Sequence, residues 1–157
     1  KEKVIEGGGP TPKQVADQQR RDAEMNYVAA ANALMAGNAR AALAACDKGL
    51  ESFRDKAVDD NPELQEMREK IFRLRKAADR LRNRQDAEEA FRNLNLRLAG
   101  VVSRERESRA IINGKILGRG ELIGAADNSE GAIVDDILPG RVVFRFRGYK
   151  MELQIRQ

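Results

Sequence analysis

The spacing of apolar residues changes near residue 94, and this change limits the fold more than any other feature of the sequence. Before it, apolar residues recur at steps of three and four, which is typical of amphipathic helices. After it, they alternate with polar residues, as in Val142, Phe144 and Phe146, which is typical of half-buried antiparallel strands. We therefore predict an α+β chain with a helical domain at residues 11–93 and a small all-antiparallel β-barrel or sandwich at residues 94–157.

The helical part is predicted to contain an antiparallel α-helical hairpin and a long third helix. After a flexible linker at residues 1–10, helices are expected at about residues 11–36, 38–54 and 62–92. The first helix begins with a capping box, because Thr11 is followed three residues later by Gln14. Gly37 suits a left-handed helix end and Asn38 suits an N-cap, so a tight turn should join the first two helices.

Apolar faces on the second and third helices predict the core of this helical part. On the second helix the expected buried face consists of Ala39, Ala42, Leu43, Cys46, Leu50 and Phe53. Cys46 is therefore predicted to be a small core residue rather than a reactive thiol. On the third helix a coiled-coil-like seam runs through Leu64, Met67, Ile71, Leu74, Ala78 and Leu81. Phe91 lies beyond that seam, so the far end of the helix is expected to project or to pack on the β domain.

Turn residues divide the β region into a meander. Asn113-Gly114 between two apolar runs predicts a tight hairpin, and Pro139-Gly140 predicts a second turn. The first strand, at residues 96–103, enters directly from the helices and is expected to lie at a sheet edge. Alternation places its residues on two sides: Leu96, Leu98 and Val102 inward, Arg97 and Val101 outward.

The composition argues against an enzyme. The chain has no histidine and a single cysteine, which removes the commonest general base and metal ligand and leaves no possible disulfide within the chain. The glycines of residues 114–124 predict turns rather than a phosphate loop, because no Gly-Lys-Ser/Thr follows. Asp135 and Asp136, considered with Asp127 as metal ligands, are neighbours in a strand and should point to opposite faces unless a bulge intervenes. We expect no catalytic residue, cofactor, metal or small-molecule substrate.

A basic segment of the third helix gives the alternative hypothesis, a cytoplasmic nucleic-acid-associated protein. The net charge is +4, and the cations gather at Arg73, Arg75, Lys76, Arg80, Arg82 and Arg84. Such a face could neutralise phosphates. Acidic residues flank it on both sides, however, and this favours a solvated helix face without strong nucleic-acid binding.

The helical hairpin resembles one unit of a tetratricopeptide repeat. The matching residues, within residues 25–62, are Leu34, Gly37-Asn38, Ala41, Cys46, Leu50 and Pro62. The sequence holds one such unit, and the long third helix departs from the pattern. The resemblance implies a hairpin that binds another protein.

The β region resembles the periplasmic homology-region domain of type II secretion inner-membrane proteins C and B, and the type IV pilus assembly lipoprotein P carries a similar domain. The matching segments stand in order as Leu96-Arg97-Leu98-Ala99-Gly100-Val101-Val102, Arg109-Ala110-Ile111-Ile112-Asn113-Gly114, Gly124, Ala132-Ile133-Val134-Asp135-Asp136-Ile137, Arg141-Val142-Val143-Phe144, Gly148 and Glu152-Leu153. The resemblance implies a β-barrel or sandwich of about six strands that contacts an outer-membrane secretin. It implies a non-enzymatic scaffold.

This resemblance also leads to a location and a binding surface. The chain begins at Lys1 without Met, and no apolar run could span a membrane. The resemblance implies the periplasmic part of a longer protein, and we expect it to be held at the inner membrane only by an anchor outside this chain. The surface predicted to face a partner consists of Arg97, Val101, Arg104 and Arg106 on and beside the first strand.

Overall fold

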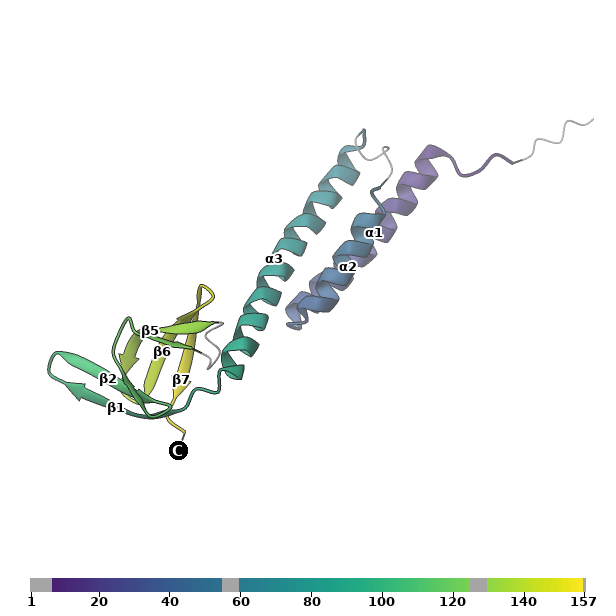
Figure 1. Cartoon of the computed structure of the whole chain (residues 1–157). Coiled ribbons are helices and arrows are strands. Elements are labelled where there is room, and N and C mark those ends of the chain that lie inside the picture. Colours follow the sequence, from purple (N-terminus) through teal and green to yellow (C-terminus); the bar gives the residue numbers. More distant parts are fainter. Residues whose placement is uncertain (1–6, 55–59, 125–129, 157) are drawn as a thin grey trace, which may run out of the picture. The chain divides into compact units, whose positions relative to one another are not determined.

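The computed structural model describes residues 7–54, 60–124 and 130–156, and it confirms the α+β class (Figure 1). The part of the predicted linker at residues 1–6 lies outside the described residues, as does Asp127. The chain divides into two compact units, residues 1–82 and residues 83–157. The elements are α1 (Pro12–Met35), α2 (Ala39–Glu51), α3 (Pro62–Asn93), β1 (Leu98–Arg104), β2 (Glu107–Ile112), β3 (Lys115–Leu117), β4 (Leu122–Gly124), β5 (Gly131–Leu138), β6 (Arg141–Phe146) and β7 (Tyr149–Gln154).

Local chemistry produces the hairpin of α1 and α2 as predicted. The Thr11 hydroxyl accepts a hydrogen bond from the Gln14 amide at 3.3 Å, and the Gln14 side chain accepts one from the Thr11 amide at 2.9 Å. At the turn, Gly37 has a φ of +75°, a left-handed conformation that glycine adopts without strain. The Asn38 side chain then caps α2 by accepting from the Ala41 amide at 3.0 Å.

The core of the first unit joins all three helices. One cluster consists of Ala23, Ala30, Cys46, Phe53, Leu64 and Ile71, and another of Ala42, Leu43 and Ala78. Leu43 is buried as predicted, whereas Leu50 is only half-buried at the margin of the first cluster. Gly49 of α2 packs tightly against Ile71 of α3, because a Cβ added at Gly49 would lie 3.0 Å from Ile71 Cδ1.

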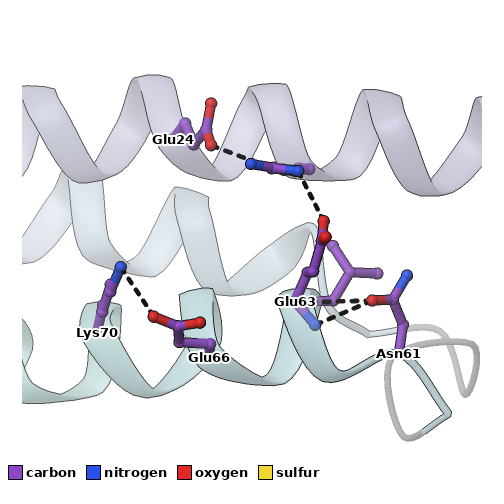
Figure 2. Close-up of polar contacts among 7 residues, drawn as sticks. Glu24, Asn61, Glu63, Glu66 and Lys70 are labelled. Carbon is purple, nitrogen blue, oxygen red and sulfur yellow. Dashed lines mark hydrogen bonds and ion pairs between the residues drawn. The ribbon is translucent and has the colours of Figure 1, made fainter.

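Polar contacts fix the start of α3 in this unit (Figure 2). The Asn61 side chain accepts from the amides of Glu63 at 3.1 Å and Leu64 at 3.4 Å, which caps the helix. Arg20 of α1 bridges Glu24 at 3.2 Å and Glu63 at 2.6 Å. These charged side chains are largely exposed, so the pairs set geometry more than they add stability.

Cys46 is fully buried in the first unit, and its burial raises the pKa of the thiol because the thiolate would lose its hydration. We expect the native protein to react with a thiol-specific dye at least about tenfold more slowly than the chain unfolded in guanidinium chloride. A matched control is the Cys46→Ala, Ala44→Cys chain, whose single thiol would stand at an exposed position of the same helix. Equal labelling rates for the native protein and this control would contradict burial.

The second unit is a sandwich of two antiparallel sheets. β1, β2 and β3 form one sheet, and β4, β5, β6 and β7 form the other, each in chain order. The predicted antiparallel arrangement is confirmed, and the described strands form the sandwich, one of the two predicted forms, rather than a closed barrel. Side chains of both sheets meet in one core, which includes Leu98, Ala110, Ile112, Leu117, Ile123, Ala132, Val134, Ile137, Val142, Phe144, Phe146 and Met151.

The last turns of α3 belong to this second core. Ala87 and Phe91 are buried within it, and the Phe91 ring centroid lies 5.5 Å from that of Phe144 and 5.8 Å from that of Phe146. The boundary between the two compact units therefore lies between residues 82 and 83. The change of apolar spacing predicted a domain boundary between residues 93 and 94.

Several turns have the predicted chemistry. Asn113 and Gly114 have φ values of +50° and +76°, the left-handed pair that a two-residue hairpin needs. Gly140 has a φ of +74°, which suits the Pro139-Gly140 turn. Arg147 and Gly148 form a further left-handed pair between β6 and β7, at +49° and +79°.

The prediction for the first strand is wrong in two details. Residues 96 and 97 lie in an irregular segment instead of a strand, after Asn95 at a φ of +52°, and β1 starts at Leu98. An irregularity in register between Leu98 and Gly100 then inserts a residue, which reverses the inward and outward sides of the rest of the strand. Val101 consequently packs against the core while Val102 is 47% exposed, so the predicted orientation of both valines is wrong.

A second bulge lies in β5 at Asp135 and Asp136. The register shifts between Val134 and Asp136, so the strict alternation expected for these two aspartates is interrupted. Both are half-buried. The Asp136 carboxylate accepts from the Ile137 amide at 2.9 Å, and the Asp135 carbonyl accepts from Arg119 Nε at 2.9 Å.

Candidate partner-binding surface

The four residues predicted to face a partner do not form one site. Arg97 lies before β1, Arg104 ends that strand, and Arg106 lies in the turn to β2. At about 3.3 Å per strand residue, β1 alone spans roughly 20 Å from Leu98 to Arg104, and Arg97 precedes that strand. Val101 is half-buried against the core and is unavailable as a principal contact.

An apolar surface nevertheless lies on the outer face of the three-stranded sheet. Gly100 pairs with Ile111, and Ile111 with Ile116, so these residues share a face with Val102. Val102 is 47% exposed and Ile116 is 62% exposed, while Ile111 is half-buried between them. We call Val102, Ile111 and Ile116 the outer apolar face. Exposed aliphatic side chains that adjoin on one side of a sheet can take part in a protein-binding surface.

The edge of this sheet supplies the second element of the candidate surface. In the described sheets β1 pairs with β2 alone, which confirms the predicted edge position and leaves unpaired main-chain groups along its other side. Arg104, at the end of β1, has no ion-pair partner among residues 7–54, 60–124 and 130–156. Arg109 lies on the outer side of β2 and pairs with Glu107 at 3.4 Å. An exposed edge beside apolar and cationic side chains can accept an extended segment of another protein.

Sequence reasoning missed Ile116 as an exposed residue and Ile111 as a half-buried residue of the outer face, because both stand in the apolar runs of the Asn113-Gly114 hairpin. The alternation of side chains between the two faces of β3 was the signal from which the exposure of Ile116 could have been predicted. Leu117 is buried and its neighbour Ile116 is exposed, as a three-residue strand with one inner face requires.

Arg106 borders a different hollow, a groove of about 400 Å³ lined by Arg106, Glu107, Ser108, Arg109, Gly118, Arg119, Glu121, Asp136 and Ile137. Most of the charged side chains that line this groove already form ion pairs or hydrogen bonds within residues 83–157. Arg109 pairs with Glu107, Arg119 donates to the Asp135 carbonyl, and Glu121 accepts from the Gly118 amide at 2.9 Å. Among the described side chains, no group of three or more carboxylates or thiols is placed to hold a metal ion.

The basic segment of α3 forms several local ion pairs. Arg73 pairs with Glu69 at 3.6 Å, Arg75 with Asp47 at 2.9 Å, Arg82 with Asp79 at 3.3 Å and Arg84 with Glu88 at 3.1 Å. These pairs reduce the free positive charge of the segment and favour a solvated face over a phosphate-binding one. Nucleic-acid binding through α3 stays the alternative hypothesis.

No family model, curated protein or solved structure matches this chain. In the described part of the chain, none of the helices has the combined length and apolarity that a membrane span requires. The candidate surface therefore rests on its own geometry: an edge strand, an outer apolar face and an unpaired arginine.

Proposed function

We propose that this chain is a non-enzymatic interaction module whose β sandwich binds a partner protein along β1 and the outer apolar face. The observation that carries the proposal is the edge position of β1 beside the exposed side chains of Val102 and Ile116. The edge would supply main-chain hydrogen bonds, and the face would bury aliphatic area that now contacts water. Arg104 would steer an acidic partner and help to fix its register.

The partner that we propose is the periplasmic domain of an outer-membrane secretin, with the chain acting in type II secretion or type IV pilus assembly. This assignment and the periplasmic location derive from the resemblance of residues 96–155 to the homology-region domain. The helical unit would bind a different protein. Its exposed residues Met25, Val28 and Met35 are three and seven positions apart on α1, so they share one side of that helix.

The full chain should bind the periplasmic domains of the secretin from the same organism with an affinity in the micromolar range, as expected for a small interface. Val102→Asp and Ile116→Asp should each weaken this binding at least about tenfold, because each places a carboxylate in the apolar contact. Isothermal titration of the two purified proteins measures both effects.

Leu122→Asp is the matched control for this titration. Leu122 is 64% exposed, nearly the same as Ile116, but it lies on β4 in the other sheet. Its replacement should change the affinity by less than about twofold. Wild-type affinity in both test variants would remove the outer apolar face from the interface. Absence of any binding by the folded wild-type chain would reject the secretin as partner.

A further inference from the structure

A second groove in residues 83–157, separate from the outer apolar face, is lined by three arginines. We call it the arginine groove. It has a volume of about 310 Å³, and its lining consists of Phe91, Arg92, Asn95, Leu96, Arg97, Glu152, Leu153 and Arg156. These residues come from the last turn of α3, the turn after it, and β7 with the residues just beyond that strand.

Main-chain contacts hold the segments that carry these arginines. After α3, Asn95 takes a left-handed conformation and turns the chain. Arg97 is then tied to the β2–β3 hairpin, because its amide donates to Asn113 Oδ1 at 2.8 Å and its carbonyl accepts from the Asn113 amide at 3.0 Å. On the other side, the Ile155 amide donates to the Gly140 carbonyl at 3.0 Å, which anchors the chain next to Arg156.

The groove has an excess of positive charge. Among the described residues that line it, Glu152 is the one carboxylate, and it pairs with Arg141 at 3.6 Å and accepts from the Gln154 side chain at 2.9 Å. Within residues 7–54, 60–124 and 130–156, none of Arg92, Arg97 and Arg156 forms an ion pair. Three guanidinium groups around one hollow favour an anionic ligand, and their planar donors suit carboxylates.

Apolar side chains and an open strand edge indicate the chemical class of the ligand more closely. Leu96 and Leu153 are half-buried against the core, and both line the groove. β7, which supplies Glu152 and Leu153, pairs with β6 alone in the described sheets and is thus an edge strand. An extended polypeptide could pair with such an edge while alternate side chains enter the groove.

We infer that the arginine groove binds an extended acidic segment of a partner protein. Its carboxylates would pair with Arg92, Arg97 and Arg156, and an apolar side chain between them would lie against Leu96 and Leu153. The inference goes beyond the function proposed above, since it assigns a separate site, at the edge of the other sheet, to a ligand of defined chemistry. It also gives Arg97 a role apart from that of Arg104.

The test uses the full chain and a fluorescein-labelled heptapeptide of alternating aspartate and leucine. Two reference peptides carry serine in place of each leucine, or lysine in place of each aspartate. Fluorescence anisotropy should show saturable binding of the Asp/Leu peptide at least about tenfold tighter than that of either reference. Equal binding of the Asp/Ser peptide would show nonspecific charge attraction and overturn the inference.

Variants locate the site and separate it from the outer apolar face. Arg97→Glu and Arg156→Glu should each weaken peptide binding at least about tenfold, whereas Arg145→Glu, at an exposed arginine of β6 outside the groove, should change it less than about twofold. Val102→Asp should leave it unchanged. Equal losses in Arg145→Glu and Arg97→Glu would overturn the inference, as would tighter binding of a labelled oligodeoxythymidine that competes for the groove. Circular dichroism of each variant confirms that it is folded.

Discussion

Replacing Phe144 with alanine should lower the free energy of unfolding of residues 83–157 by about 3–5 kcal/mol. Phe144 is fully buried on β6, which pairs with β5 on one side and β7 on the other. Its ring also contacts that of Phe91 at 5.5 Å, so truncation removes an aromatic pair and leaves a cavity between β6 and α3. A unit of this size has a total stability of about 5–10 kcal/mol, and the variant should be close to unfolding at room temperature.

Hydrogen–deuterium exchange with mass spectrometry measures this effect unit by unit. Peptides from β5, β6 and β7 should exchange much faster in Phe144→Ala than in the wild-type chain. Arg145→Ala, at the exposed neighbouring position, should change stability by less than about 0.5 kcal/mol. Phe91→Ala gives an independent comparison, because it should accelerate exchange in the same strands if the last turns of α3 belong to this core. Unaltered exchange in both phenylalanine variants would contradict the described packing.

Features set by neighbouring residues could be predicted from the sequence. The capping box at Thr11, the turn at Gly37-Asn38 and the hairpin at Asn113-Gly114 each depend on a few adjacent side chains and their preferred main-chain angles. The α+β fold class could be predicted for the same reason, from apolar residues at steps of three and four and from apolar residues at every second position. Each spacing reflects the geometry of a single helix or strand.

Features set by contacts between distant segments could not be predicted. The bulge between Leu98 and Gly100 arises from the pairing of β1 with β2. It places Val101 and Val102 on the faces of the sheet opposite to those predicted. The sequence left open whether the end of α3 projects or packs on the β domain, and the choice is decided by the Phe91 ring, which meets Phe144 and Phe146 more than fifty residues later in the chain. The arginine groove likewise unites Arg92, Arg97 and Arg156, which no short motif connects.

In the helical unit the largest effect is expected from Ile71→Ala, which should cost about 2–5 kcal/mol of stability. Ile71 is fully buried on α3 and belongs to one cluster with residues of α1 and α2, so its loss opens a cavity among three helices. Phe72→Ala is the matched control, because Phe72 is the next residue of α3 and is 53% exposed. Urea unfolding followed at 222 nm should show a large shift for Ile71→Ala and a small one for Phe72→Ala. Similar shifts in both variants would contradict the assigned face of α3.

The contact between Ile71 and Gly49 can be tested separately from burial. A Cβ at Gly49 would lie 3.0 Å from Ile71 Cδ1 and 3.3 Å from Asn26 Cβ, so Gly49→Ala should overpack the wild-type core despite its better helix propensity. Ile71→Val removes the Cδ1 atom. In that background the added methyl group meets less resistance, and Gly49→Ala should become less destabilising or even favourable. A double-mutant cycle should therefore give a coupling energy of about 1 kcal/mol or more between the two positions. Additive effects would contradict the tight contact between Gly49 and the Ile71 side chain.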